Sequence, residues 1–257
     1  MSHSTQTEDI LGYRVAMGGE AACVEAIMGW VTTGNACRWL SCINPHSYVV
    51  ARSNDAFRVA LRAANWLVPD GAGIVLASKL LGGQIRTRVT GSDLFREVNR
   101  ELNKSGGSMF LLGATEETLS RIRVRLAQDV PNACVAGTYS PPFKSEFSQD
   151  DTDAMIAAIN TSGADVLWVG LTSPKQDLWL HRNHDRLNVK FAAGIGAVFD
   201  FYSGRVKRSH PAFQKLGLEW LPRLLQEPRR LYRRMLVSAP IFVWDVLSQM
   251  LTRKPSS

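Results

Sequence analysis

The chain has 257 residues, of which 45% are hydrophobic and 21% charged, and its formal net charge is +7. This length and composition exclude a disordered chain and a small disulfide-held scaffold. Its four cysteines, Cys23, Cys37, Cys42 and Cys134, form no CxxC pair, so we expect neither a zinc site nor a disulfide framework. This cysteine pattern is typical of a protein in the reducing cytoplasm. The sequence shows no signal peptide and no apolar run of about 18 residues that could span a membrane.

The charge is concentrated near the end of the chain. Residues 205–257 contain eleven Lys or Arg and three acidic residues, which gives +8 and leaves −1 for the first 204 residues. A near-neutral body with a basic end predicts an anionic partner for that end. We therefore expect a flexible N-terminus (1–10), a body (11–204) and a basic amphipathic helical appendage (205–257).

Short apolar runs alternate with helical patterns through the body. Most of these runs are continuous, which is typical of parallel strands covered on both faces. The expected strands are Trp39–Ile43, Trp66–Val68, Ser108–Leu112, Ala133–Gly137, Val166–Gly170 and Val189–Ala193. Their alternation with helices predicts an α/β fold with a doubly wound, mostly parallel sheet, whose ligands bind at the carboxyl ends of the strands.

Two helices carry clear end signals. Thr115 is the expected N-cap of a helix that ends near Val130, with Glu116 and Glu117 in its first turn. A second helix is expected over Asp150–Ser162. The DxD sequence Asp151-Thr152-Asp153 lies in its first turn, so we interpret it as charge that complements the helix dipole rather than as a metal site.

Polar residues follow two of the expected strands. Asn44 and Asp70 each come directly after one, so both should lie at the carboxyl edge of the sheet. Asp70-Gly71 precedes an expected helix over Ala72–Leu81. Asp70 is therefore either the N-cap of that helix or a general base in the crevice, and the pattern leaves both interpretations open.

Two later segments offer polar groups at the same edge. Thr172-Ser173-Pro174 begins a helix with Lys175 and Gln176 in its first turn, which suits either anion binding or ordinary capping. Asp200 lies in the run GIGAVFDFYSG, whose glycines permit close approach of a ligand. A buried structural role for Asp200 is the equal alternative.

Several familiar signatures are missing. The sequence has no GxxxxGK[ST] loop, no complete dinucleotide glycine fingerprint, and no HExxH, GxSxG or Cys-His signature. We expect no cofactor and no metal, so a bound diphosphate would depend on helix N-termini or arginines. In the basic end, arginines interleave with Leu and Trp at helical spacing, which suits packing on the body or lying in a lipid interface. A solvated charged face is the equal alternative.

Four segments together resemble the WecG/TagA/CpsF glycosyltransferases, family 26 of that enzyme class. They are PDGAGIVLASKLLG…RVTGSDL, PKQDLW, GIGAVFDFYSG and GLEWLPRLLQEPRRLYRR, in the family's order and spacing, and the resemblance runs from Ile10 to Arg234. It implies a metal-independent, inverting transfer from a UDP-sugar donor to a polyprenyl-diphosphate-linked sugar acceptor in bacterial cell-surface polysaccharide biosynthesis. The sugar would be N-acetylmannosamine or a related hexose.

The resemblance also implies roles for individual residues. Asp70 falls on the catalytic base and Asn44 on an active-site asparagine. The implied substrate-binding residues are Arg88, Thr90, Gln176, Asp200, Arg223, Arg230 and Arg233. The last three are expected to close over the site from the appendage. Four positions depart from the family's pattern and leave the donor sugar open: Cys42, Thr172, Asp177 and His210.

Partners and location follow from the same resemblance. We expect peripheral attachment to the anionic inner face of the plasma membrane, and the resemblance leaves a homo-oligomer open. The basic end lacks any recognised nucleic-acid module, so we expect no nucleic acid partner. The alternative function is a non-catalytic α/β protein that binds nucleotides or polyanions. A Rossmann-type oxidoreductase is disfavoured because the glycine fingerprint is incomplete.

Overall fold

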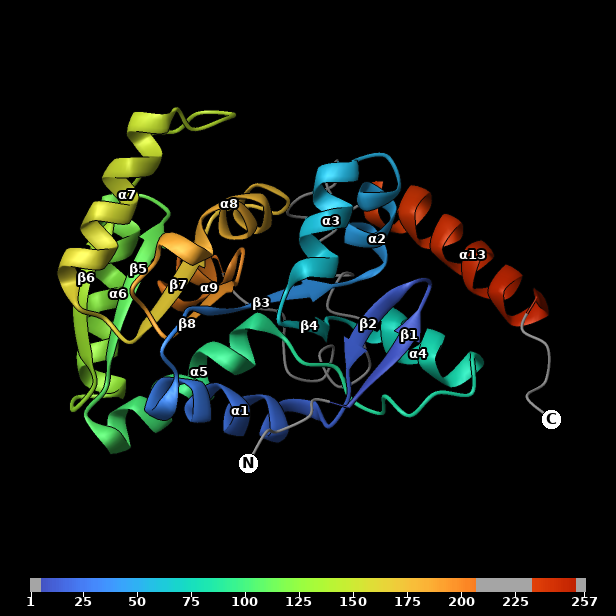
Figure 1. The fold of residues 1–257 in the computed structure, drawn as a ribbon, viewed down its shortest axis with the longest axis horizontal. Coiled ribbons are helices and arrows are strands. Elements are labelled where there is room, and N and C mark those ends of the chain that lie inside the picture. Colours follow the sequence, from blue (N-terminus) through green and yellow to red (C-terminus); the bar gives the residue numbers. More distant parts are fainter. Residues whose placement is uncertain (1–5, 207–232, 253–257) are drawn as a thin grey trace.

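The computed structural model describes residues 6–206 and 233–252, with side chains from 236 onward in the second range. Its centre is a six-stranded parallel sheet with the order β4-β3-β8-β7-β5-β6 (Figure 1). The strands are β3 (Arg38–Ile43), β4 (Trp66–Pro69), β5 (Ser108–Gly113), β6 (Cys134–Tyr139), β7 (Val166–Gly170) and β8 (Phe191–Gly194). All six expected strands are present, and the prediction of a doubly wound, mostly parallel α/β fold is confirmed.

The N-terminal region contains structure that the sequence did not predict. Thr7–Ile10 form β1, which pairs antiparallel with β2 (Tyr13–Ala16). The prediction of a flexible segment over residues 1–10 is therefore wrong for Thr7–Ile10. Ile10, Tyr13 and Val15 are buried in a core cluster that also contains Ile43 of β3. Strands of four residues are too short to give a clear alternating pattern, whereas this burial fixes them in the folded chain.

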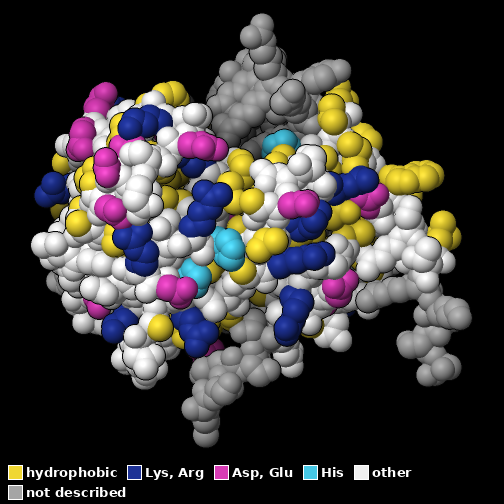
Figure 2. Space-filling model, turned by 45° about the horizontal axis from the view of Figure 1, so that its top comes forward, with side chains coloured by type: hydrophobic (Ala, Val, Ile, Leu, Met, Phe, Trp, Pro, Cys, Tyr) yellow, Lys and Arg dark blue, Asp and Glu magenta, His cyan; other side chains and the backbone are white. Residues whose placement is uncertain are grey.

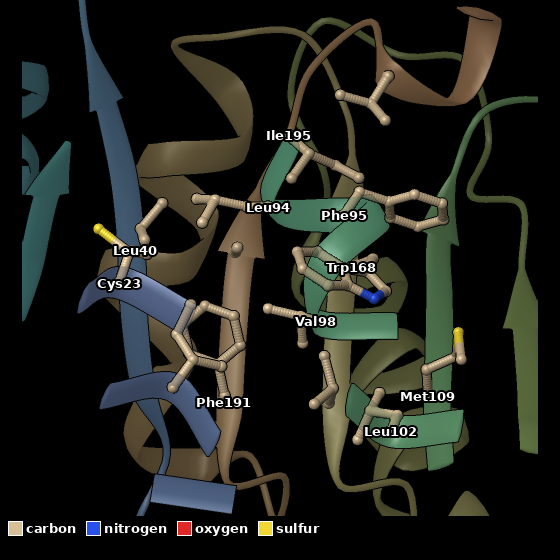
Figure 3. Close-up of a cluster of buried hydrophobic side chains, with 14 of the residues drawn as sticks. Cys23, Leu40, Leu94, Phe95, Val98, Leu102, Met109, Trp168, Phe191 and Ile195 are labelled. Atoms are coloured by element: carbon tan, nitrogen blue, oxygen red, sulfur yellow. The ribbon is translucent and has the colours of Figure 1, made fainter. Parts of the chain in front are cut away.

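Helices cover both faces of the sheet. One face is covered by α1 (Gly19–Thr33), α5 (Gly91–Ser105), α6 (Glu116–Asp129) and α9 (Val198–Tyr202), and the other by α3 (Asp55–Ala63), α7 (Gln149–Ser162) and α8 (Lys175–Asn183). On the first face, Leu94, Phe95 and Val98 of α5 lie over Trp168 and Phe191 (Figure 3). The buried indole of Trp168 is satisfied because its Nε1 donates to Asn99 Oδ1 at 3.0 Å.

The expected helix ends are confirmed. Thr115 accepts a hydrogen bond from the Thr118 backbone N–H, and α6 begins at the next residue. The α7 helix begins after Ser148, which forms a capping box with Asp151. Asp151 also forms an ion pair with Lys144 at 2.7 Å, and Lys144 is the main reason that the Asp151 pKa is lowered to about 2. Asp151 thus stabilises the first turn of α7, as the sequence predicted.

The described part of the C-terminal segment packs on the body. A π-helix, η2 (Arg233–Ser238), leads into α13 (Ala239–Thr252), which contacts α2 (Pro45–Arg52) and α4 (Ala72–Leu80). Phe242 and Val246 of α13 are buried against the core. Within 6–206 and 233–252, no helix is long and apolar enough to cross a membrane.

Polar contacts reinforce this docking of α13. Asp245 Oδ2 accepts from the Tyr48 hydroxyl at 2.8 Å and from Arg52 Nη1 at 2.9 Å. His46 Nδ1 lies 2.9 Å from Ser238 Oγ. The segment therefore contacts α2, the helix that follows Asn44, and α4, the helix that follows Asp70-Gly71.

Candidate active site

Asn44 and Asp70 meet at the carboxyl edge of the sheet. Asn44 is the N-cap of α2: its Oδ1 accepts from the Ser47 N–H at 2.9 Å, and its own N–H donates to Ser47 Oγ at 2.8 Å. This capping box fixes the side chain, whose Nδ2 donates to Asp70 Oδ2 at 3.1 Å. The Asp70 N–H donates to the Ile43 carbonyl at 2.8 Å, so two strand ends hold the pair in place.

Asp70 is not the N-cap of the following helix. That position belongs to Gly71, with φ 90° and ψ 160°, and α4 begins at Ala72. This backbone conformation is readily adopted by glycine and by few other residues. Gly71 therefore turns the chain into α4 and leaves the Asp70 carboxylate at the strand end, which favours the general-base interpretation over capping.

The RVTG loop, residues 88–91, lies beside this pair. The Val89 N–H donates to the Pro69 carbonyl at 2.8 Å, which places Arg88 and Thr90 next to the end of β4. Thr90 is buried and caps α5, and its hydroxyl donates to Asp93 at 2.6 Å. A Cβ on Gly91 would lie 3.3 Å from Val198, so the loop also contacts the segment that follows β8.

Gln176 supports the loop after β8. It lies in the first turn of α8, which has no side-chain cap, and its Oε1 accepts from the Gly196 N–H at 3.0 Å. A Cβ on Gly194 would come within 2.8 Å of Gln176 Nε2, so glycine allows this approach without a shift of the Gln176 side chain. The expected start of a helix after Pro174 is confirmed, and Gln176 braces the backbone rather than capping the helix.

The other predicted residues lie around this edge or outside the described part of the chain. Asp200, in α9, accepts from Arg205 Nε at 3.0 Å and pairs with its Nη2 at 2.9 Å. Arg223 and Arg230 lie outside the described residues, and the backbone of Arg233 begins η2 while its side chain is not described. The structure thus joins Asn44 and Asp70 directly, and it brings Gly91 and Gln176 to the segment that follows β8.

One buried polar contact near this edge could hardly be predicted from the sequence. Ser41 Oγ, on β3, donates to Asp177 Oδ1 on α8 at 2.5 Å, and the two residues are 0% and 2% exposed. Burial raises the pKa of Asp177 to about 6, while the hydroxyls of Ser41 and Ser173 act in the opposite direction. The only signal was that Asp177 departs from the pattern of the family that the sequence resembles. The contact itself leaves no local signal, because 136 residues separate Asp177 from Ser41.

A cleft of about 530 Å³ lies elsewhere, between α5, α6 and α9. Arg96, Arg100 and Arg125 line it, and each forms an ion pair with a carboxylate, at 2.7, 2.9 and 3.4 Å respectively. None of the predicted site residues whose side chains are described lines this cleft. We therefore place the candidate active site at the carboxyl edge rather than in this cleft.

A parallel α/β body with a fixed carboxylate at its carboxyl edge defines a class of proteins that bind ligands at the strand ends. Comparison with known sequences narrows that class. The profile of the family "Glycosyl transferase WecG/TagA/CpsF family" matches residues 8–256. The chain belongs to this family and is a glycosyltransferase.

Two relatives are named N-acetylglucosaminyldiphosphoundecaprenol N-acetyl-beta-D-mannosaminyltransferase. The one from Bacillus spizizenii is 34% identical over 204 residues, which cover 79% of this chain and 76% of the relative. The one from Bacillus subtilis is 30% identical over 216 residues, which cover 84% and 81%. The family resemblance read from the four sequence segments is confirmed.

Proposed function

We propose that this glycosyltransferase moves N-acetylmannosamine, or a related hexose, from a UDP-sugar to a polyprenyl-diphosphate-linked sugar. The acceptor class comes from the names of the relatives, which act on a lipid-diphosphate-linked N-acetylglucosamine. The observation that supports the chemistry best is the hydrogen bond from Asn44 Nδ2 to Asp70 Oδ2 at 3.1 Å. It orients a carboxylate at the edge where α/β sheets bind their ligands.

Asp70 acts as the general base in this mechanism. A sugar hydroxyl is a poor nucleophile, so the Asp70 carboxylate takes its proton as the oxygen attacks the anomeric carbon of the donor. The bond from that carbon to the diphosphate oxygen breaks, and its electron pair leaves with UDP. Attack from the side opposite UDP inverts the anomeric configuration. Asn44 holds the carboxylate in the orientation that accepts the proton.

Arginines stabilise the departing UDP. Negative charge grows on the diphosphate as the bond breaks, and bidentate guanidinium groups match phosphate oxygens well. Arg88, on the loop beside Asp70, is one such group, and the appendage supplies Arg223, Arg230 and Arg233. We place this neutralisation on arginine rather than on a metal ion. Closure of the appendage would also exclude water from the reaction.

The test is UDP release by the full-length protein. Several UDP-sugars are offered with a short-chain lipid diphosphate that carries N-acetylglucosamine. We expect acceptor-dependent release with one donor, and a loss of roughly 1,000-fold in kcat for Asp70→Asn, within the range for general bases. Asp165→Asn, at the opposite edge of the sheet, is the matched control and should keep its kcat. Activity that survives Asp70→Asn would contradict the proposed base, whereas no release with any donor and acceptor would favour a binding protein.

We further propose that α13 contacts the membrane from which the acceptor is presented. Trp244, Leu247 and Leu251 share one face of α13 and are 72%, 38% and 81% exposed. Figure 2 shows hydrophobic side chains gathered at the right of the view, where α13 lies. An exposed apolar helix face on a basic segment suits the interface of an anionic membrane, with roughly 1 kcal/mol from each nearby Lys or Arg.

Vesicle flotation tests this attachment. Full-length protein should float with vesicles that contain anionic phospholipid, less with neutral ones, and high salt should release it. Trp244→Ala should weaken the binding. Val124→Ala, which removes a side chain that is 60% exposed on α6, should not. Equal flotation of all variants would place the contact elsewhere, and absence of flotation would contradict it.

A further inference from the structure

The first turn of α8 joins parts of the sheet that carry the candidate active site. Gln176 reaches the loop after β8 through Gly196, and its neighbour Asp177 reaches β3 through Ser41. Ser41 lies three residues before Asn44, and Ile43 pairs with Pro69, the residue before Asp70. A displacement of β3 at Ser41 would therefore move both members of the Asn44–Asp70 pair.

Asp177 is an unusual choice for a purely structural contact. Its Oδ1 accepts the short hydrogen bond from Ser41, but its buried Oδ2 has no hydrogen-bond partner of ordinary geometry in the described part of the chain. A buried carboxylate with an unsatisfied oxygen destabilises a fold, whereas an amide could accept the same hydroxyl without the charge. What the charge adds is a shorter, stronger bond, because a hydroxyl approaches a carboxylate to about 2.5–2.7 Å.

A second observation places Asp177 electrostatically near the reacting edge. Cys42 lies between Ser41 and Ile43 on β3, and its thiol pKa is raised first by burial and then by Asp70 and Asp177. Both carboxylates thus act on the same side chain. Asp70 and Asp177 therefore both lie within electrostatic range of one side chain of β3, while the hydrogen bond to Ser41 keeps Asp177 within the protein rather than in contact with a ligand.

We propose that Asp177 is a positioning residue for sugar transfer, which through Ser41 fixes the end of β3 and with it the Asn44–Asp70 pair. This inference rests on the proposed transferase function. It predicts that loss of the Ser41–Asp177 bond lowers kcat without a matching loss of stability or of substrate binding. A misplacement of reacting groups by less than 1 Å is sufficient for a large loss of rate.

The test compares Asp177→Asn, Ser41→Ala and the double variant with the wild type in the UDP-release assay. Each single variant should lower kcat by about 10- to 100-fold and leave the KM values within about twofold. The double variant should lose no more than the worse single variant, because Ser41→Ala removes and Asp177→Asn weakens the same contact. Thermal unfolding at pH 7.5 should show Asp177→Asn at least as stable as the wild type.

The matched control is Asp165→Asn, which alters another Asp–Ser contact of the same sheet. It should lower stability and keep kcat, the reverse of Asp177→Asn. If both single variants keep kcat within twofold, or if their losses multiply in the double variant, the inference is wrong. If Asp177→Asn fails to fold, Ser41→Ala alone decides. A wild type without acceptor-dependent release would refute the transferase proposal itself, whereas the outcomes above leave that proposal standing.

Discussion

Two Asp–Ser pairs hold strands of this sheet, one between the starts of β5 and β7 at the amino edge and one between β3 and α8 near the carboxyl edge. At the amino edge, Asp165 Oδ2 accepts from the Ser108 N–H at 2.8 Å and from Ser108 Oγ at 2.7 Å, and the Asp165 N–H donates to Ser108 Oγ at 3.1 Å. Near the carboxyl edge, Asp177 has one hydrogen bond of ordinary geometry, from Ser41, and its buried Oδ2 has none among the described residues, although the Ser173 hydroxyl also acts on the carboxylate. The same residue types thus form a reciprocal contact at one edge and an incomplete one at the other.

The comparison distinguishes a contact that stabilises the fold from a contact that positions the candidate active site. The reciprocal pair satisfies its polar groups and leaves the Asp165 side chain partly exposed, so it stabilises at little cost in desolvation. The incomplete pair buries a charge that the fold alone does not require. Residues that destabilise a protein in this way are expected where function needs them.

The largest expected effect concerns the helix that braces the carboxyl edge from outside. Phe242 of α13 is 3% exposed and packs on α2 and α4 near Tyr48. Phe242→Ala should lower the free energy of unfolding by about 3–5 kcal/mol, because it leaves a cavity in the core. Trp244→Ala, on the exposed face of the same helix, should change it by less than about 0.5 kcal/mol. If urea unfolding gives the same free energy of unfolding for both variants, α13 does not support this edge.

The buried charge itself should appear as a pH dependence of stability. The Asp177 pKa is raised from 3.8 to about 6 by burial, so its carboxyl group favours folding when protonated, and this contribution is lost as the pH rises through about 6. Between pH 4 and pH 8, Asp177→Asn should therefore gain up to about 3 kcal/mol relative to the wild type. Urea unfolding at several pH values measures the difference. A constant difference would mean that Asp177 does not titrate in this range.

Much of the fold could be predicted from the sequence, because its signals are local. Continuous apolar runs marked the six parallel strands, and Thr115 marked the start of α6. The β1–β2 hairpin could not be predicted, since its short strands are fixed by burial against distant residues such as Ile43.

The contacts of the candidate site also fall into predictable and unpredictable ones. Asn44 and Asp70 could be predicted because each directly follows an apolar strand, and parallel strands end at a common edge. The bond from Ser41 to Asp177 and the bond from Tyr48 to Asp245 could not, because 136 and 197 residues separate the partners. No periodicity or spacing encodes a contact of that kind, which only the folded chain creates.

A smaller effect is expected at the amino edge. Asp165→Asn replaces a carboxylate that accepts two hydrogen bonds from Ser108, and an amide accepts them more weakly. The free energy of unfolding should fall by about 2 kcal/mol at pH 7.5, with kcat unchanged. Chemical unfolding and the UDP-release assay check the two parts. A loss of kcat would show that both edges, and not only the carboxyl edge, control the reaction.

The smallest expected effect separates the capping role of Asn44 from its role beside Asp70. Asn54 is the matched residue: it caps α3 by accepting from the Phe57 N–H at 3.0 Å. Serine caps helices about as well as asparagine, so Asn44→Ser and Asn54→Ser should each change stability by less than about 0.5 kcal/mol. Only Asn44→Ser removes the amide that donates to Asp70, so kcat should fall about tenfold in that variant alone, the equivalent of about 1.4 kcal/mol. Equal kcat values for the two variants would mean that Asn44 only caps a helix and that the strand ends orient Asp70. A lower kcat for Asn44→Ser alone would show that this side chain both caps α2 and orients the general base.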